Sequence, residues 1–352
     1  MNEDIFTRYP QVAGNPLAMA ALCQELRTRG MASDAFAIGS AAMTAAPENM
    51  EVRDLVRGLL AKGVPSWHLP MLRDAPRNQC YRTAIERAVR PGMRVLEIGT
   101  GAGLLALLAA RAGAEVVTCE ADPIVAAAAR ENIRRNGMAD RIRVISKFSN
   151  DLLIGEDLDE PADLLMSELF DDILFGDNIV EVIADARERL LKPGAQVIPP
   201  RSALRCALVS LPRPAERPIG DVEGFDLSAF NFLSPAGSVL LRAKSADAEI
   251  RSEVTSALAM DFERELPFGP IRERHRLISH GGRIDGVAQW LRIDFGDGVF
   301  YENDPFASGS SHWGAPVFPL VTPIETQKGD AIDVMVRVDA SLLIMHAERA
   351  RD

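Results

Sequence analysis

The stretch Val95-Leu96-Glu97-Ile98-Gly99-Thr100-Gly101-Ala102-Gly103 decides the fold. Its mostly apolar start predicts a buried strand, its glycines predict a tight turn, and an apolar helical pattern runs on from Gly103 to Ala112. The same order repeats along the chain, with expected strands at Val116–Cys119, Ile142–Ser146 and Leu164–Met166 and expected helices at Pro123–Arg135 and Ile179–Leu191. Alternating strands and helices predict an α/β fold with a parallel, doubly wound sheet.

The residues before this core are predicted to be helical. Three Ala- and Leu-rich helices, at 17–27, 34–45 and 52–60, are separated by Gly30 and Pro47. This layout is similar to one tetratricopeptide-like hairpin plus a third helix, a unit too small to bury its own apolar face. We therefore expect it to pack on the rest of the chain or on a second subunit. A link over 63–76 and a helix around Arg77–Val89 lead into the core.

The residues after Pro199 and Pro200 have a different pattern, because short apolar runs follow one another without long helices. This predicts an antiparallel, β-barrel-like domain. The expected strands are Ala203–Ser210, Val239–Leu241, Glu253–Met260, Val287–Ile293, Ala315–Leu320 and Ile332–Val338. The sequence thus predicts three parts: a helical region (1–63), an α/β domain (64–199) and a β-barrel-like domain (200–352).

The composition excludes several classes of protein. Thirty-nine basic and 50 acidic residues give a net charge of −11, which argues against a nucleic-acid-binding surface spread over the molecule. A negative field attracts cationic substrates, although solubility alone also explains such a charge. The four cysteines lack CxxC spacing, so neither a metal site nor a disulfide framework is expected. An acidic start and no long apolar run predict a cytoplasmic protein without a membrane span. Only five basic residues are Lys, which is typical of a GC-rich bacterial genome.

The glycine turn predicts a nucleotide-like ligand. Its spacing is G-x-G-x-G rather than the G-x-G-x-x-G of dinucleotide sites, and Glu97 lies two residues before the first glycine. A carboxylate at this place suits a ligand that carries an ammonium group. Glu120 ends the next strand, where a carboxylate can accept both ribose hydroxyls. Together these features favour S-adenosyl-L-methionine over NAD.

A second motif, the segment Glu168–Asp177, follows the strand at Leu164–Met166. Parallel sheets bind their ligands at the carboxyl ends of strands. The segment places two carboxylates, Glu168 and Asp177, on either side of an apolar run. It is either a solvated acidic loop or a clamp for a cation, and a guanidinium presents a planar fork of donors that suits carboxylates.

At this point the sequence resembles the protein arginine N-methyltransferases over roughly residues 64–340. Five segments carry the resemblance, in the family's order: Trp67–Tyr81, with its Met-Leu-x-Asp-x-x-Arg pattern; Glu97–Gly103; Glu168–Asp177, with the nine-residue spacing of the paired-glutamate loop; Gly224–Ser228; and Ser311-His312-Trp313. The Glu168 segment is most similar to members that stop at monomethylation. The resemblance implies a homodimer, formed either by an arm within 210–245 or by the helices of 17–62.

The resemblance also implies a role for each matching position. Cofactor-binding residues would be Arg77 (on the methionine carboxylate), Glu97, Gly99, Gly101 and Gly103 (along the methionine end), Glu120 (on the ribose), and Phe148 and Ser149 (beside the adenine). Acceptor-binding residues would be Glu168 and Asp177 on the guanidinium, with Trp313 and His68 beside them. Glu168, Asp177, His312 and Asp74 would be catalytic, with His312 paired to Asp74. Either Glu168 or the Asp74–His312 pair would take the proton, and S-adenosyl-L-homocysteine would be the second product.

One departure from the family pattern bears on the acceptor. Asp177 stands where the family has Glu, and its side chain is one methylene shorter. Together with the bacterial composition, this favours free L-arginine as acceptor, giving Nω-methyl-L-arginine in natural-product biosynthesis. The alternatives are arginine in a protein or peptide, methylation of a different amine or carboxylate, and a non-catalytic partner subunit.

Overall fold

The computed structural model describes residues 3–174, 178–212, 219–233, 239–241, 248–264, 266, 269–307, 311–339 and 342–351. The chain divides into two units, each assembled from several segments. The first unit comprises Met1–Arg73, Ile85–Ser167 and Arg189–Ala195, and the second comprises Asp74–Ala84, Glu168–Glu188 and Gln196–Asp352. Each unit has a hydrophobic cluster of its own.

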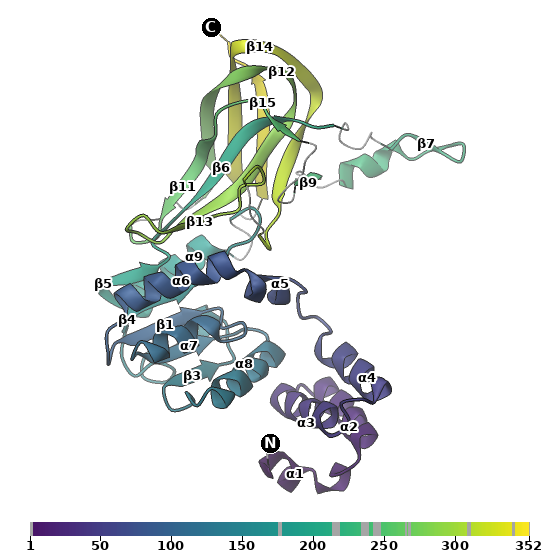
Figure 1. The fold of residues 1–352 in the computed structure, drawn as a ribbon, viewed down its shortest axis with the longest axis vertical. Helices are drawn as coiled ribbons and strands as arrows, with labels where there is room; N and C mark the ends of the chain where they lie inside the picture. Colours follow the sequence, from purple (N-terminus) through teal and green to yellow (C-terminus); the bar gives the residue numbers. More distant parts are fainter. Residues whose placement is uncertain are drawn as a thin grey trace. The chain divides into compact units, whose positions relative to one another are not determined.

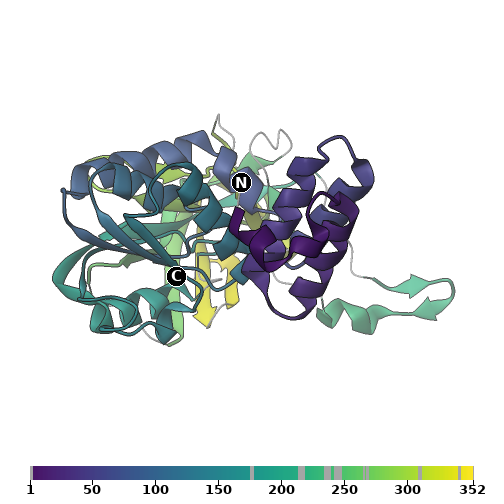
Figure 2. The ribbon, with the colours of Figure 1, turned by 90° about the horizontal axis from the view of Figure 1, so that it is seen from below.

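The first unit begins with short helices that lie together as a bundle, in purple in Figure 2. Asn15 and Asn49 begin two of them, and each side-chain oxygen accepts a backbone N–H three residues further on at 3.1 Å. Such caps satisfy N–H groups that a helix leaves free at its start. The elements are α1 (Glu3–Arg8), η1 (Pro10–Val12), α2 (Pro16–Thr28), α3 (Ala32–Ala45), α4 (Met50–Leu60) and α5 (His68–Arg73).

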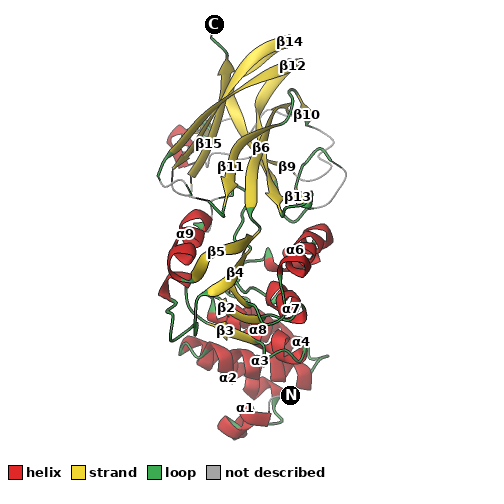
Figure 3. Ribbon diagram, turned by 90° about the vertical axis from the view of Figure 1, so that its left-hand side faces the viewer, coloured by secondary structure: helices red, strands yellow, loops and turns green. Residues whose placement is uncertain are grey.

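A five-stranded sheet forms the centre of the first unit, in the order β3-β2-β1-β4-β5. The pairs β1–β2, β1–β4 and β2–β3 are parallel. The strand order reverses at β1, which confirms the predicted parallel, doubly wound sheet. Its elements, shown with their helices in Figure 3, are β1 (Arg94–Ile98), α7 (Leu104–Arg111), β2 (Glu115–Cys119), α8 (Pro123–Arg135), β3 (Ile142–Ile145), η2 (Ser149–Asp151), β4 (Ala162–Ser167) and β5 (Leu191–Ile198).

The N-terminal helices pack on this α/β core. Ile124 of α8 belongs to the same hydrophobic cluster as Ile38 of α3 and Val56 of α4. Within the helical region itself, the side chains of Arg8 and Tyr9 donate to the buried carboxylate of Asp34, at 2.5 and 2.7 Å. Of the two expected packing partners for these helices, the rest of the chain is therefore the one that the structure shows.

The second unit contains an eight-stranded sheet whose described pairs are antiparallel. Its two longest strands bend along their length in Figure 3, as a barrel-like sheet requires. Trp290 and Ala288 are buried against Val209 and Val317 inside it. The strands are β6 (Arg201–Ser210), β9 (Val239–Leu241), β10 (Glu249–Ile250), β11 (Thr255–Asp261), β12 (Ile271–Asp294), β13 (Phe300–Glu302), β14 (Ala315–Asp339) and β15 (Leu342–Arg349).

Three further elements of the second unit form a small hairpin and a helical turn, which we call the arm (residues 219–233). They are β7 (Asp221–Val222), β8 (Phe225–Asp226) and η3 (Ser228–Leu233), seen at the β7 label in Figure 1. The side chain of Asn231 accepts the N–H of Ile219 at 2.7 Å and donates to the carbonyl of the same residue at 2.8 Å. Two further helices are α6 (Ala75–Ala88), which belongs to both units, and α9 (Ile179–Arg189).

Several predicted elements need correction. The expected link at 63–76 contains α5, and the expected helix to Leu191 ends at Arg189 because Leu191 begins β5. The expected strands 315–320 and 332–338 are the two ends of one strand, β14, while 287–293 is only the last part of β12. Glycines inside β12 conceal its length. At Gly286 an added Cβ would lie 2.8 Å from the carbonyl oxygen of Phe318, so this glycine permits close strand packing.

Among the described residues, no helix is both long and apolar enough to cross a membrane.

Candidate active site

The topology of the first unit determines where a ligand can bind. β1 and β4 are neighbours at the point where the strand order reverses, and open α/β sheets bind ligands outside the carboxyl ends of such strands. The glycine loop follows β1, and Ser167, the last residue of β4, pairs with Ile98 of β1. Glu168 directly follows Ser167 in the chain. The two sequence motifs therefore leave adjacent strands at the same edge.

The glycine loop has a backbone that only glycine adopts readily. Gly99, Gly101 and Gly103 have φ values of 87°, 51° and 86°. The N–H groups of Gly99 and Thr100 donate to the carbonyl of Cys119, at 3.0 and 3.1 Å, which fixes the loop to the end of β2. α7 begins directly after the loop, so its free N–H groups lie at the same place.

Two carboxylates lie beside this loop. Glu97 is buried, which raises its pKa to about 8, although the Thr118 hydroxyl and the Ala106 backbone act to lower it. Within the described part of the chain, neither Glu97 carboxylate oxygen has a hydrogen bond of ordinary geometry. Glu120 accepts the N–H of Gly101 at 2.9 Å and that of Asp122 at 3.0 Å. Two carboxylates therefore border the loop, and of these Glu120 is held by two hydrogen bonds of ordinary geometry.

The other residues predicted to contact the cofactor follow β3. Phe148 is exposed and Ser149 is buried, at the start of η2.

His68 stacks on Trp67 with ring centroids 4.0 Å apart. Its Nδ1 lies 4.0 Å from the place where a Cβ on Gly101 would stand. The structure therefore places His68, predicted to bind the acceptor, beside the glycine loop.

The second unit holds a buried ion pair between Arg77 and Glu168. Nη2 of Arg77 lies 2.7 Å from Oε2 of Glu168, and the two side chains are 3% and 7% exposed. Burial lowers the pKa of Arg77, the Glu168 carboxylate raises it, and the net shift is upward. Oε1 of Glu168 and Nε of Arg77 are buried without a hydrogen-bond partner among the described residues. Because a buried polar atom without a partner is unfavourable by about 1–3 kcal/mol, this pair is suited to receiving a ligand.

A second buried cluster brings Asp74 and His312 together. Oδ2 of Asp74 accepts Nδ1–H of His312 at 2.9 Å and the hydroxyl of Tyr301 at 2.5 Å. Burial raises the pKa of Asp74, but the donors from His312 and Tyr301 lower it, and the net shift is downward. Trp313 is buried beside them, with its ring 4.1 Å from the His312 ring between centroids.

Comparison with known proteins identifies the family to which this chain belongs. A family model described as ribosomal protein L11 methyltransferase (PrmA) matches residues 79–199. An arginine N(omega)-methyltransferase from Streptomyces achromogenes subsp. streptozoticus is 34% identical over 325 residues, 91% of this chain and 89% of that protein. The chain belongs to the arginine N-methyltransferase family.

Other arginine methyltransferases match a shorter part of this chain or match it at lower sequence identity. Protein arginine N-methyltransferase 7 from Oryza sativa subsp. indica is 40% identical over 152 residues, which is 40% of this chain but 21% of that protein. The solved PRMT1 enzyme–prozyme complex with AdoHcy from Trypanosoma brucei has the same fold, with a TM-score of 0.70 at 21% identity. That match covers 83% of this chain and 95% of the other.

The structure of this methyltransferase also shows residues that the sequence did not single out. Oδ1 of Asp172 accepts the N–H of Gly314 at 3.0 Å, and its backbone carbonyl accepts Nε2 of Gln289 at 2.9 Å. These bonds join the segment after Glu168 to the loop that holds Trp313. Asp172 lies within the Glu168–Asp177 segment but was given no role, and no sequence motif marks Gln289 or Tyr301, because each of these residues acts through contacts distant in the chain. Asp177, the second predicted carboxylate, lies outside the described residues.

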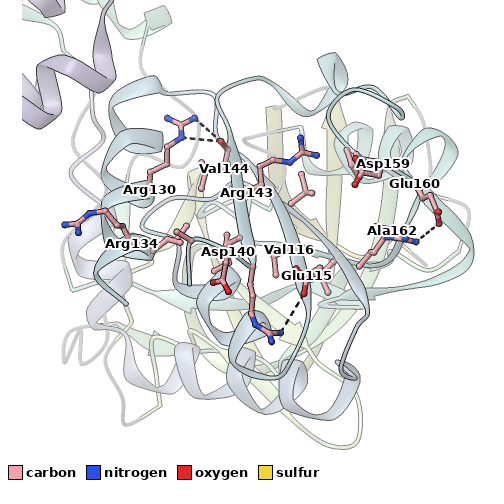
Figure 4. Close-up of a pocket in the computed structure, with 18 residues that line it drawn as sticks. Glu115, Val116, Arg130, Arg134, Asp140, Arg143, Val144, Asp159, Glu160 and Ala162 are labelled. Atoms are coloured by element: carbon pink, nitrogen blue, oxygen red, sulfur yellow. Dashed lines mark hydrogen bonds and ion pairs between the residues drawn. The ribbon is translucent and has the colours of Figure 1, made fainter. Parts of the chain in front are cut away.

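A cavity of about 900 Å³ in the first unit of the methyltransferase has none of these residues in its lining (Figure 4). Its lining includes Arg94, Glu115, Ile142 and Ala162, which begin β1, β2, β3 and β4. It therefore lies at the amino ends of the strands, opposite the edge where such sheets bind ligands. Its arginines are already engaged, as for Arg130, whose Nη2 donates to the carbonyl of Val144 at 3.0 Å. The cavity's size is therefore no reason to place the cofactor there.

Proposed function

We propose that this enzyme methylates a terminal guanidino nitrogen of free L-arginine, giving Nω-methyl-L-arginine and S-adenosyl-L-homocysteine. As a member of its family, it uses S-adenosyl-L-methionine as methyl donor. The Streptomyces relative, named for arginine rather than protein arginine, matches over 89% of its own length. The chain spans only 21% of the rice protein arginine methyltransferase. The matched region thus favours the small acceptor.

The observation that carries the proposal is the free carboxylate oxygen of Glu168. Oε2 is paired with Arg77 at 2.7 Å, and Oε1 is buried without a partner among the described residues. A guanidinium supplies N–H donors in a plane and stays protonated at neutral pH, so it satisfies a buried acceptor of this kind. Trp313 and His68 are predicted to border the same acceptor.

The described residues fit the cofactor. Among the described residues, the buried oxygens of Glu97 accept no hydrogen bond of ordinary geometry, which suits the ammonium group of the methionine end, and Nε of Arg77 donates none, which suits its carboxylate. Gly99, Gly101 and Gly103 leave the loop open to a close backbone approach. We propose that Glu120 binds the ribose through its remaining lone pairs, with Phe148 and Ser149 at the adenine. When bound, the cofactor supplies an electrophilic sulfonium methyl group.

The chain's own residues then orient the acceptor and hold its charge. A protonated guanidinium is a poor nucleophile, and Glu168 would fix one terminal nitrogen in line with the methyl group. Its carboxylate would also stabilise the positive charge as that charge passes to the product. His312 donates Nδ1–H to Asp74, which leaves Nε2 as an acceptor, so either His312 or Glu168 can take the released proton. Asp177 is proposed as the second carboxylate on the guanidinium.

The test compares acceptors directly. The purified enzyme is incubated with methyl-labelled S-adenosyl-L-methionine and either free L-arginine or an arginine-rich peptide. We expect label in free arginine with a kcat/KM at least about tenfold above that for the peptide. The reverse preference would make it a protein arginine methyltransferase, and no label in either would favour a non-catalytic partner subunit or another acceptor.

We further propose that the arm mediates a homodimer. Its described residues include several exposed large apolar side chains, with Phe232 91% exposed, whereas the N-terminal helices pack a cluster of buried apolar side chains with Ile124 of α8. An exposed apolar cluster of this kind is typical of an interaction site. Phe232→Glu should convert a dimer to a monomer in analytical ultracentrifugation. Met50→Glu, at an exposed position of α4, is the matched control and should leave the dimer intact. If Met50→Glu gave a monomer and Phe232→Glu did not, dimerisation would be assigned to the N-terminal helices instead of the arm.

A further inference from the structure

Tyr301 on β13 is buried at the centre of the Asp74 cluster. Its hydroxyl lies 2.5 Å from Oδ2 of Asp74 and 2.6 Å from Oγ of Ser311. An ionised carboxylate can only accept, so the single phenolic proton belongs to the bond with Asp74. Ser311 therefore donates its own proton to the Tyr301 oxygen, while its Oγ accepts the N–H of Trp313 at 3.1 Å.

These bonds form one directed chain, from the Trp313 N–H through Ser311 and Tyr301 to Asp74. His312 donates two hydrogen bonds to the same carboxylate, one from Nδ1 at 2.9 Å and one from its backbone N–H at 3.3 Å. The loop that carries His312 and Trp313 is thus held by two routes that meet at Asp74. The Tyr301 ring also packs edge-on against Trp313, with centroids 5.7 Å apart.

We propose that Tyr301 is a positioning residue for methyl transfer: its hydroxyl holds Asp74 ionised and, through Ser311, fixes the loop so that His312 presents Nε2 as proton acceptor. The proposal rests on the arginine methyltransferase activity proposed above. It adds a residue that touches neither acceptor nor cofactor and acts through Asp74.

The charge environment of Asp74 gives the proposal a pH signature. The groups that face it are Arg77 and Cys80 from α6, Tyr301 from β13 and His312 from the loop. Loss of the Tyr301 hydroxyl removes one donor that lowers the pKa of Asp74, so this pKa rises. If Asp74 must be ionised to hold His312, activity is lost below that pKa. The acid limb of the rate profile therefore moves to higher pH.

Tyr301→Phe tests this, because it keeps the ring and removes only the hydroxyl. Tyr9→Phe is the matched control, since Tyr9 also donates to a buried aspartate, Asp34, at 2.7 Å but lies in the N-terminal helices. In Tyr301→Phe, kcat should fall and its acid limb should move up by about half a pH unit or more, with KM for the cofactor unchanged. Tyr9→Phe should keep the wild-type limb. A lower kcat with an unmoved limb would show a merely structural role and overturn the proposal.

Amide hydrogen exchange over residues 311–314 separates this inference from the proposed function. Exchange in this segment should be faster in Tyr301→Phe and unchanged in Tyr9→Phe, whether or not the wild type methylates arginine. Faster exchange in a protein inactive on every arginine acceptor would show that Tyr301 fixes the loop and would refute the proposed function. Wild-type exchange in Tyr301→Phe would refute the positioning role, even in an active enzyme.

Discussion

Replacing Glu168 by Gln is the sharpest perturbation of the acceptor site. The substitution keeps the size of the side chain and removes its charge. It leaves the Arg77 guanidinium buried, with only an amide oxygen where a carboxylate lay 2.7 Å away. The acceptor guanidinium loses the free Oε1 as a charged partner. Cofactor residues of the glycine loop are untouched.

The size of the effect follows from burial. The side chains of Arg77 and Glu168 are 3% and 7% exposed, so solvent screens the lost attraction little. A hydrogen bond to a charged group contributes about 1.5–3 kcal/mol, which corresponds to roughly 10- to 150-fold in rate. Misplacement of the acceptor by about 1 Å adds up to roughly 100-fold. We therefore expect kcat/KM for arginine to fall by at least about 100-fold.

The assay measures methyl transfer from labelled cofactor and, separately, the Kd of S-adenosyl-L-homocysteine by calorimetry. The Kd should change much less than kcat/KM does, because Arg77, the proposed partner of the cofactor carboxylate, keeps its charge and an amide oxygen beside it. Asp333→Asn is the matched control, since Asp333 is a buried carboxylate paired with Arg274 and Arg276 on the β sheet. It should lower stability and leave kcat/KM unchanged. A Glu168→Gln enzyme within about threefold of wild type would refute the reasoning.

Three further predictions concern other parts of the molecule. The pKa of Glu97 is about 8 in the folded protein and about 4.5 in the unfolded chain, so between these values Glu97 is protonated when folded and ionised when unfolded. The unfolding free energy of the apo protein should therefore fall as the pH rises through this range. Glu97→Gln should flatten that slope in denaturant titrations from pH 5 to 9. Asp177→Glu restores the longer carboxylate of the family pattern, and the product, identified by mass spectrometry, should shift from mono- toward dimethyl-arginine. An unchanged product would show that the length of this side chain does not determine the degree of methylation. Gly286→Ala places a Cβ 2.8 Å from the carbonyl oxygen of Phe318. The melting temperature should drop, because overpacking of this kind destabilises a protein by about 1–3 kcal/mol. A wild-type melting temperature would show that β14 moves to make room for the added methyl group.

The sequence predicted the α/β core well because its signals are local. Strand, glycine turn and helix follow one another within the stretch from Val95, and α8 begins and ends where its pattern does, at Pro123 and Arg135. The β-rich part was predicted in class but not in strand length. In β12 and β14, glycines and bulges interrupt the apolar alternation, while pairing with neighbouring strands carries each strand across the interruption.

The candidate site was predictable where a family motif marks a residue. Glu168, His312 and Asp74 were named in this way, and the structure brings His312 to Asp74 at 2.9 Å. The ion pair between Arg77 and Glu168 was not foreseen, since each residue had been predicted to hold a different ligand. Tyr301 was also missed, because it reaches Asp74 across 227 residues of chain and no local spacing records such a contact.

Methylation of the guanidino group of free arginine by this chain can be tested in a single competition experiment. Wild-type enzyme receives labelled S-adenosyl-L-methionine with free L-arginine and an arginine-rich peptide in the same tube, and the products are separated and analysed by mass spectrometry. We expect label on Nω of free arginine, formed at least about 100-fold more slowly when Glu168→Gln replaces the wild type. Label confined to the peptide, or labelling of free arginine by Glu168→Gln at a rate within about threefold of wild type, would contradict this function.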